Sequence, residues 1–110
     1  MAHGALKGLR LIEMGQLIAG PFCGQLMADH GAEVIKIEPP GDGDPMRAWG
    51  REKPLWFPVV ARNKKCITLN LRSPKGQDIV RQLAAKSDFL LENFRPGTME
   101  KWNLGYEALK

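Results

Sequence analysis

Asn93, Phe94 and Arg95 are the residues of this sequence best suited to hold an anionic ligand. They directly follow a short apolar segment at residues 89–92, which has the composition of a buried strand. An aromatic ring can stack on a nucleotide base, and an arginine guanidinium can contact a phosphate. The three residues therefore predict contact with a small polyanion at the end of a strand.

A second basic group, Arg62, Lys64 and Lys65, precedes another candidate strand at residues 66–71. Two interpretations stay open for it: solvated surface charge, or contact with a phosphate. The remaining basic residues are scattered, so the net charge of +4 does not form the stripe that duplex binding needs. We expect no nucleic-acid partner.

Four carboxylates lie where a ligand could meet them. Glu13 and Glu38 end two candidate strands, at the edge that faces ligands in a parallel sheet. We interpret both primarily as helix-cap or ion-pair partners. Asp42 and Asp44 belong to a GDGDP sequence and are expected to shape turns rather than to bind a metal.

No convincing catalytic group accompanies these residues. His3 lies near the N-terminus and His30 at the end of a predicted helix, and H-x-x-x-H, C-x-x-C and G-x-S-x-G patterns are absent. Cys23 and Cys66 fit neither a metal site nor a disulfide framework, so we expect buried, reduced thiols. The sequence predicts no catalytic residue and no metal site.

The elements that would position these residues begin with a strand, a helix and a second strand. We expect them at residues 9–14, at 21–30 with Pro21 in the first helical position, and at 33–38. Three side chains form the predicted apolar face of the helix: Phe22, Leu26 and Met27. This order is the first βαβ unit of a doubly wound fold, whose ligand crevice lies at the carboxyl ends of the strands.

The turn inside this unit is not a dinucleotide fingerprint. Gly15, Gly20 and Gly24 are spaced by five and four residues, whereas the fingerprint is G-x-G-x-x-G. NAD is therefore not expected as a ligand, although free N–H groups at the start of the helix would suit an anion or a carbonyl oxygen.

A long segment at residues 39–65 follows, and its large aromatic residues Trp49, Trp56 and Phe57 indicate a loop that docks on the domain or a neighbour. The elements expected after it are a strand at 66–71, a helix capped by Ser73 with Ile79, Val80 and Leu83 on its apolar face, a strand at 89–92, and a helical stretch at 99–109.

Length and composition agree with a globular α/β chain. The 110 residues allow one domain at most, and the hydrophobic share of 44% and charged share of 25% are ordinary. The first residues lack the apolar core of a signal peptide, and no apolar run approaches the ~18 residues of a membrane span. We expect a cytoplasmic protein without a membrane partner.

Several stretches together resemble the class III CoA-transferases, the family that includes formyl-CoA transferase, carnitine CoA-transferase and α-methylacyl-CoA racemase. They cover the chain from Leu6 onward and read LKGLRLIEM, IAGPFCGQLMADHGAEVIKIEPPGDGDPMRAWG, NKKCITLNLRSPKG and SDFLLENFRPGTMEKWNLGYEAL. The resemblance implies a Rossmann-like parallel sheet with flanking helices, here the N-terminal part (residues 1–110) of the CoA-binding large domain. It also implies an interlocked homodimer.

By the same resemblance, coenzyme A, as a substrate and not as a tightly bound cofactor, would lie across the strand ends. The positions that match the family's CoA contacts are Gln16, Ala19, Leu69, Asn70, Leu71, Arg72, Asn93, Phe94, Arg95 and Lys101. The chain departs from some members at Pro39, where they have an adenine-contacting Arg, and at Ile18, where they have Gln near the acyl group. The second departure argues against formyl-CoA as substrate.

The family's mechanism implies attack by an Asp on the acyl-CoA thioester, followed by resolution with a carboxylic acid. That Asp would lie beyond Lys110, so we expect a CoA-transferase as the parent protein but no turnover by these residues alone. An open sheet edge and bare apolar faces would favour self-association. Alternatives are a racemase of the same family, which the long Met46–Val60 segment disfavours, or a catalytically silent CoA-binding or assembly module. The acyl donor and acceptor are not predicted.

Overall fold

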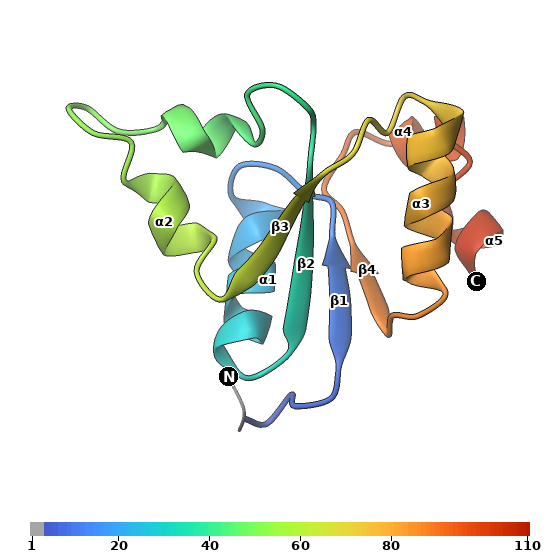
Figure 1. Cartoon of the computed structure of the whole chain (residues 1–110), viewed down its shortest axis with the longest axis horizontal. Helices are drawn as coiled ribbons and strands as arrows, with labels where there is room; N and C mark the ends of the chain where they lie inside the picture. The colour runs from blue at the N-terminus through green and yellow to red at the C-terminus, as the bar shows by residue number, and fades with distance from the viewer. Residues whose placement is uncertain (1–3) are drawn as a thin grey trace.

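Four parallel strands form the centre of the computed structural model, which describes residues 4–110 (Figure 1). They are β1 (Arg10–Glu13), β2 (Glu33–Glu38), β3 (Lys64–Thr68) and β4 (Phe89–Leu91), in the spatial order β3-β2-β1-β4. The chain runs outward from β1 to β3 and then crosses to β4, on the other side of β1. The predicted doubly wound α/β fold is confirmed, and the strand order reverses between β1 and β4.

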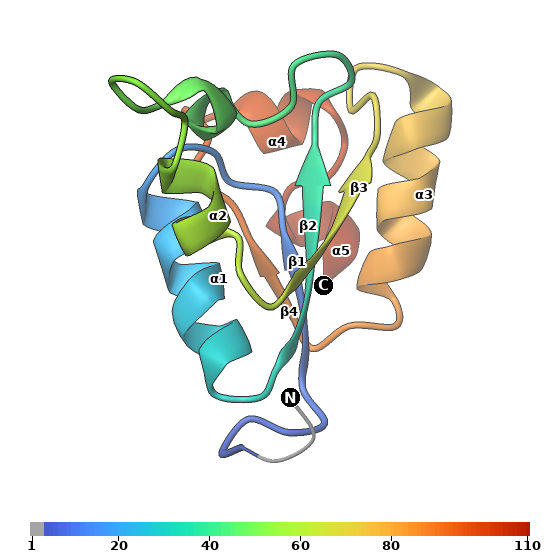
Figure 2. The ribbon, with the colours of Figure 1, turned by 60° about the vertical axis from the view of Figure 1, so that its left-hand side comes forward.

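Helices cover both faces of this sheet (Figures 1 and 2). On one side lie α1 (Ala19–Asp29) and α2 (Trp56–Val60), and on the other lie α3 (Pro74–Ala84) and α5 (Tyr106–Leu109); α4 (Thr98–Lys101) lies at the carboxyl ends of the strands. Alternation along the strands divides the core accordingly. Leu11 and Val34 pack with Ala28 of α1, whereas Ile12 and Ile37 pack with Val80 of α3.

The predicted apolar face of α1 is wrong for Phe22 and Leu26, whereas Met27 packs against the core as expected. Phe22 and Leu26 are 51% and 44% exposed, and the buried side of the helix is formed by small residues at a spacing of four: Gly20, Gly24 and Ala28. Small side chains let the helix backbone approach the sheet closely, so they turn inward and the large side chains turn outward. The helix also begins two residues before Pro21.

The predicted burial of the two cysteines is wrong, although both are free thiols as expected. Cys23 lies on the outward side of α1 and Cys66 on the edge strand β3, and both are exposed free thiols. An edge strand has a neighbour on one side only, so fewer atoms cover its side chains.

The segment between β2 and β3 docks only in part. It contains a 3-10 helix, η1 (Pro45–Ala48), and α2, and it buries Met46 and Val60. Trp49 and Trp56 stay 39% and 56% exposed. Docking on the domain is therefore confirmed for Met46 and Val60. The two tryptophans are not buried on the domain, and their docking on a neighbour stays a prediction.

Element ends differ modestly from the prediction. β3 is Lys64–Thr68 rather than 66–71, because the Asn70 side chain accepts a hydrogen bond from the Arg72 N–H and starts a turn. The predicted cap of α3 is confirmed, since Ser73 Oγ accepts a hydrogen bond from Gly76 N–H at 3.1 Å. The stretch at 99–109 forms two short helices, α4 and α5, interrupted at Asn103, whose φ is 54°. His30 follows α1 as expected, and the interpretation of His3 lies outside the described residues.

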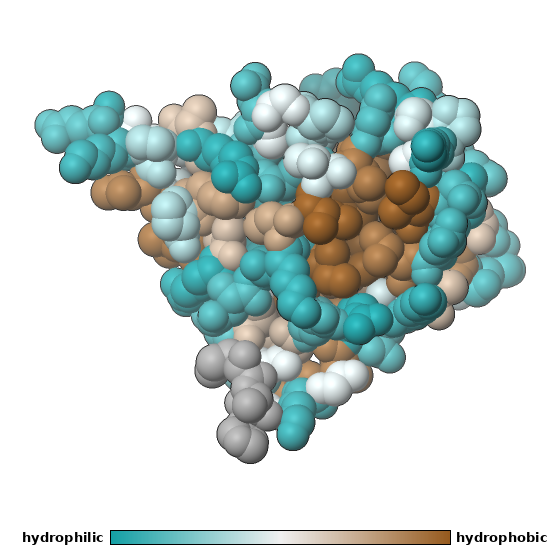
Figure 3. Space-filling model, viewed as in Figure 1, coloured by the Kyte–Doolittle hydropathy of each residue, from teal (hydrophilic) through white to brown (hydrophobic). Residues whose placement is uncertain are grey.

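Apolar side chains gather on the face between β3 and α3 (Figure 3). Ile35, Leu69, Leu83 and Leu90 are among the apolar residues that pack against the core and stay partly exposed. None of the helices within residues 4–110 combines the length and the apolar character needed to cross a membrane.

Candidate functional site

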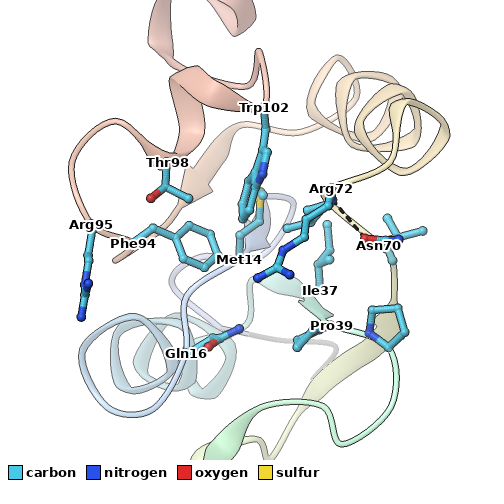
Figure 4. A pocket seen from close by; sticks show the side chains of 13 residues that line it. Met14, Gln16, Ile37, Pro39, Asn70, Arg72, Phe94, Arg95, Thr98 and Trp102 are labelled. Carbon is cyan, nitrogen blue, oxygen red and sulfur yellow. Dashed lines mark hydrogen bonds between the residues drawn. The ribbon is translucent and has the colours of Figure 1, made fainter.

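A cavity of about 670 Å³ lies at the carboxyl ends of the strands, below α4 (Figure 4). Residues that end or follow each of the four strands line it, together with Thr98 and Trp102 of the α4 region. The strand-end residues are Met14, Gln16, Ile37, Pro39, Pro40, Leu69, Asn70, Leu71, Arg72, Phe94 and Arg95. Its size lies within the range of small-molecule sites, and its place is the one expected for a ligand in a doubly wound sheet.

Seven of the ten residues proposed as CoA contacts line this cavity: Gln16, Leu69, Asn70, Leu71, Arg72, Phe94 and Arg95. Three do not. Ala19 is exposed at the start of α1, Lys101 is exposed on α4, and Asn93 is bonded to the backbone of the first turn. The structure thus gathers most of the predicted set, while their contact with CoA stays a prediction.

Phe94 and Trp102 form the aromatic wall of the cavity. Their rings meet edge to face with centroids 5.3 Å apart and planes at 80°. Buried Met14 and Ile37 add apolar surface beside them. Trp102 was not among the predicted contacts; the signal that could have found it is its place directly after Lys101, on the segment that follows the ENFRPG turn.

Two arginines supply positive charge at the cavity. Arg72 and Arg95 are exposed, and neither is ion-paired with a carboxylate within residues 4–110. In Figure 4 the Arg72 guanidinium extends towards Gln16, whereas Arg95 lies on the outer side of Phe94. Both cations are available to an anionic ligand.

The other basic group, Arg62, Lys64 and Lys65, forms ion pairs away from the cavity, so phosphate contact by it stays a prediction without support from this geometry. The interpretation as solvated surface charge is wrong for Lys64, whose side chain is buried. Arg62 pairs with Asp29 at 2.7 Å and Lys65 with Glu33 at 2.6 Å. Lys64 is enclosed completely and pairs with Glu13 at 2.6 Å. None of the three lines the cavity.

Asn93 ties the first turn to the end of β4. Its Oδ1 accepts a hydrogen bond from Gln16 N–H at 2.8 Å, and its Nδ2 donates to the Gln16 carbonyl at 3.0 Å. The backbone N–H and the backbone carbonyl of Gln16 are thereby both held by the Asn93 side chain. The Gln16 side chain is left to face the cavity (Figure 4).

A buried ionic cluster lies under this turn: Glu13, Lys36, Asp44 and Lys64. Lys36 Nζ is 2.8 Å from Glu13 Oε2 and 2.8 Å from Asp44 Oδ2, and Lys64 Nζ is 2.6 Å from Glu13 Oε1. All four side chains are at most 1% exposed, and the two cations balance the two anions. The ion-pair interpretation of Glu13 and the turn interpretation of Asp44 are confirmed, since Asp44 also accepts from Met46 N–H.

The pKa values of the two lysines in this cluster shift in opposite directions. For Lys36, burial disfavours the ammonium, but the carboxylates of Glu13 and Asp44 outweigh it and raise the pKa. For Lys64, burial prevails over Glu13 and lowers the pKa. Lys36, held by two carboxylates, is therefore the more firmly charged of the two.

Glu38 is also occupied. Its carboxylate accepts two hydrogen bonds from Arg47 at 2.7 Å each and one from Asp44 N–H at 2.9 Å. Burial opposes ionisation of Glu38, but Arg47 and the Asp44 amide hold its pKa below the ordinary value. The ion-pair interpretation is confirmed, and Glu38 is not placed to accept a ribose hydroxyl.

The lining of the cavity is suited to binding a ligand. The residues around the cavity include two arginines, two amides, a hydroxyl and two aromatic rings, and no carboxylate, thiol or imidazole. Within residues 4–110, no three histidine, cysteine, aspartate or glutamate side chains gather as metal ligands. The arrangement can hold a ligand that combines anionic groups with a planar ring.

The chain is similar to known CoA-transferases. The pattern of a family described as "CoA-transferase family III" matches residues 6–110. The chain is 60% identical over 108 residues to a succinyl-CoA--D-citramalate CoA-transferase of Chloroflexus aurantiacus, covering 94% of this chain and 27% of that protein. It is 42% identical over 108 residues to the succinyl-CoA:glutarate CoA-transferase of Homo sapiens, covering 94% and 25%.

The chain is also similar in structure to solved proteins. The crystal structure of a hypothetical protein, Rv3272, from Mycobacterium tuberculosis matches with a TM-score of 0.90 and 42% identity, covering 96% of this chain and 30% of that one. A CAIB/BAIF family protein from Brucella suis matches with a TM-score of 0.91 and 39% identity, covering 98% and 30%. The chain spans about a quarter of the length of the curated relatives it matches.

Proposed function

The chain belongs to CoA-transferase family III, and from that premise we propose that its strand-end cavity binds the CoA part of an acyl-CoA thioester. The observation that carries the proposal is the pairing of uncompensated cations with an aromatic wall in one cavity at the strand ends. Arg72 and Arg95 suit the phosphates, and Phe94 and Trp102 suit the adenine ring.

For the parent protein we propose transfer of CoA between an acyl-CoA and a carboxylic acid, through a homodimer located in the cytoplasm. The attacking Asp of the family's mechanism has no counterpart in the cavity, because no carboxylate lines it. These 110 residues therefore supply CoA-binding elements and are expected to show no thioester exchange by themselves.

The names of the relatives support a choice of substrate class. One is a succinyl-CoA--D-citramalate CoA-transferase, another a succinyl-CoA--L-malate CoA-transferase beta subunit at 45% identity, and a third a succinyl-CoA:glutarate CoA-transferase. We propose succinyl-CoA as the donor and a dicarboxylic acid as the acceptor. The same names favour transfer over the racemase alternative, while a CoA-binding module describes what this chain does alone.

Calorimetric titration of the 110-residue chain with CoA tests the binding proposal. We expect saturable binding, weakened about tenfold or more by Arg72→Met because a charge-assisted contact is lost. The matched control is Lys86→Met, which also removes one positive charge. Lys86 lies after the C-terminal end of α3 and does not line the cavity. Absence of binding by the wild-type chain, or equal weakening by the two variants, would refute the assignment of this cavity.

A further inference from the structure

We infer that Lys36 and Asp44 are positioning residues that hold the turn at residues 15–17 in the shape the ligand cavity requires. The inference rests on the proposed function, because the Gln16 side chain of this turn lines the cavity proposed for CoA. Neither Lys36 nor Asp44 lines the cavity, so each would act on the ligand only through the turn.

The turn needs external support. Leu17 has a φ of 64°, in the left-handed region that a branched, non-glycine residue adopts only at a cost. A residue keeps such a conformation when its surroundings fix it, and function is often built on it. Leu17 lies directly between the cavity-lining Gln16 and the entry to α1.

The two buried side chains supply that support through the backbone. Lys36 Nζ donates to the Gly15 carbonyl at 3.1 Å, and Asp44 Oδ1 accepts from Leu17 N–H at 3.0 Å. Lys36 and Asp44 also pair with each other at 2.8 Å, so one buried unit holds the turn on both sides of Gln16. Asn93 fixes the Gln16 peptide itself, from the β4 side.

Asp44 extends this unit into the segment after β2. The same Oδ1 that accepts from Leu17 N–H accepts from Met46 N–H at 2.9 Å, and the Asp44 N–H donates to Glu38. The neighbouring Pro39 and Pro40 line the cavity on that side. Lys36 and Asp44 therefore link the wall of the cavity that contains Gln16 to the wall that contains Pro39 and Pro40.

The other half of the ionic cluster offers a matched comparison. Lys64 is as deeply buried as Lys36 and pairs with the same carboxylate, Glu13, but its remaining hydrogen bond goes to the Pro21 carbonyl inside α1. It has no bond to the turn. Removing either ammonium leaves the cluster with one excess negative charge, so both removals disturb stability, while only one releases the turn.

The experiment compares Lys36→Met with Lys64→Met in the 110-residue chain. CoA affinity is measured by calorimetry, amide hydrogen exchange at Gln16 and Leu17 by NMR, and the urea midpoint by circular dichroism. We expect both variants to lower the midpoint, and only Lys36→Met to raise the Kd for CoA, about tenfold, and to accelerate exchange at Leu17. Equal effects of the two variants on Kd and exchange, or no effect of Lys36→Met, would overturn the inference.

Two further arms keep the test decisive. If Lys36→Met does not fold, Asp44→Asn replaces it. This variant retains the shape of the side chain but turns Oδ1 into a neutral and therefore weaker acceptor for the Leu17 N–H, and it leaves Lys36 with a single anionic partner. We expect about a threefold rise in the Kd for CoA and faster exchange at Leu17. Unchanged values for Asp44→Asn would overturn the inference. If the wild-type chain does not bind CoA, the proposed function fails, and the exchange at Leu17 still decides whether Lys36 holds the turn.

Discussion

Gly24 lies at the closest approach between α1 and the buried ionic cluster, and we predict that Gly24→Ala is strongly destabilising. A Cβ at this position would lie 1.8 Å from Glu13 Oε1 and 3.4 Å from Lys64 Nζ. Glu13 cannot move aside freely, because Lys36 holds one of its oxygens and Lys64 the other.

The size of the effect follows from that geometry. An ordinary van der Waals contact begins near 3.4 Å, so the carboxylate oxygen must retreat by about 1.6 Å, which separates it from Lys64. Breaking one partner out of a buried ion pair costs about 3–5 kcal/mol. Alanine recovers about 1 kcal/mol of helix propensity over glycine, so we expect a net loss of about 2–4 kcal/mol in the free energy of unfolding.

Urea unfolding followed by circular dichroism measures this loss. Cys23→Ala is the control, because it changes the adjacent, exposed position of the same helix, and its effect should stay within about 0.5 kcal/mol. A Gly24→Ala variant as stable as the wild-type chain would refute the argument that the two lysines fix the Glu13 carboxylate against α1.

Three further outcomes are expected. Ser73→Ala removes the N-cap of α3 and should lower the free energy of unfolding by about 1 kcal/mol in the same urea assay. Because the Glu38 pKa is held below its ordinary 4.5, its contribution to stability is complete above that pH and is lost as the pH falls below it; Glu38→Gln should flatten this acid dependence in a pH series of thermal melts. Both thiols should react with a disulfide reagent in the folded chain, and Cys66 more slowly than Cys23 at pH 8, because desolvation and the nearby Glu38 raise the pKa of Cys66; identical rates would contradict this.

The strands of the sheet could be predicted because each is encoded by a short, continuous stretch of sequence. Alternating or continuous apolar runs set the strands, and Ser73 with Pro74 marks the start of α3. The orientation of α1 was not predicted correctly, since hydrophobicity alone favoured Phe22 and Leu26. The glycine and alanine residues spaced by four, starting at Gly20, were the better signal, because the closeness of two backbones depends on the absence of side chains.

The candidate site was predictable only in outline. Strand-end residues such as Arg72 and Phe94 follow from topology, because parallel strands bring their carboxyl ends to one edge. The role of Lys36 was missed, although a lysine between Ile35 and Ile37 in a buried strand signals a charge that needs a buried partner. Its partner Asp44 lies eight positions further on, in a loop whose path the sequence does not specify.

The most direct test of CoA binding at the strand ends uses the three tryptophans as reporters. Trp102 lines the cavity, whereas Trp49 and Trp56 lie on the segment between β2 and β3 and do not. Titration of the ¹⁵N-labelled chain with CoA should shift the indole N–H signal of Trp102, assigned with Trp102→Phe, and leave the other two signals in place. Shifts confined to Trp49 or Trp56, or no shift at saturating CoA, would contradict the account.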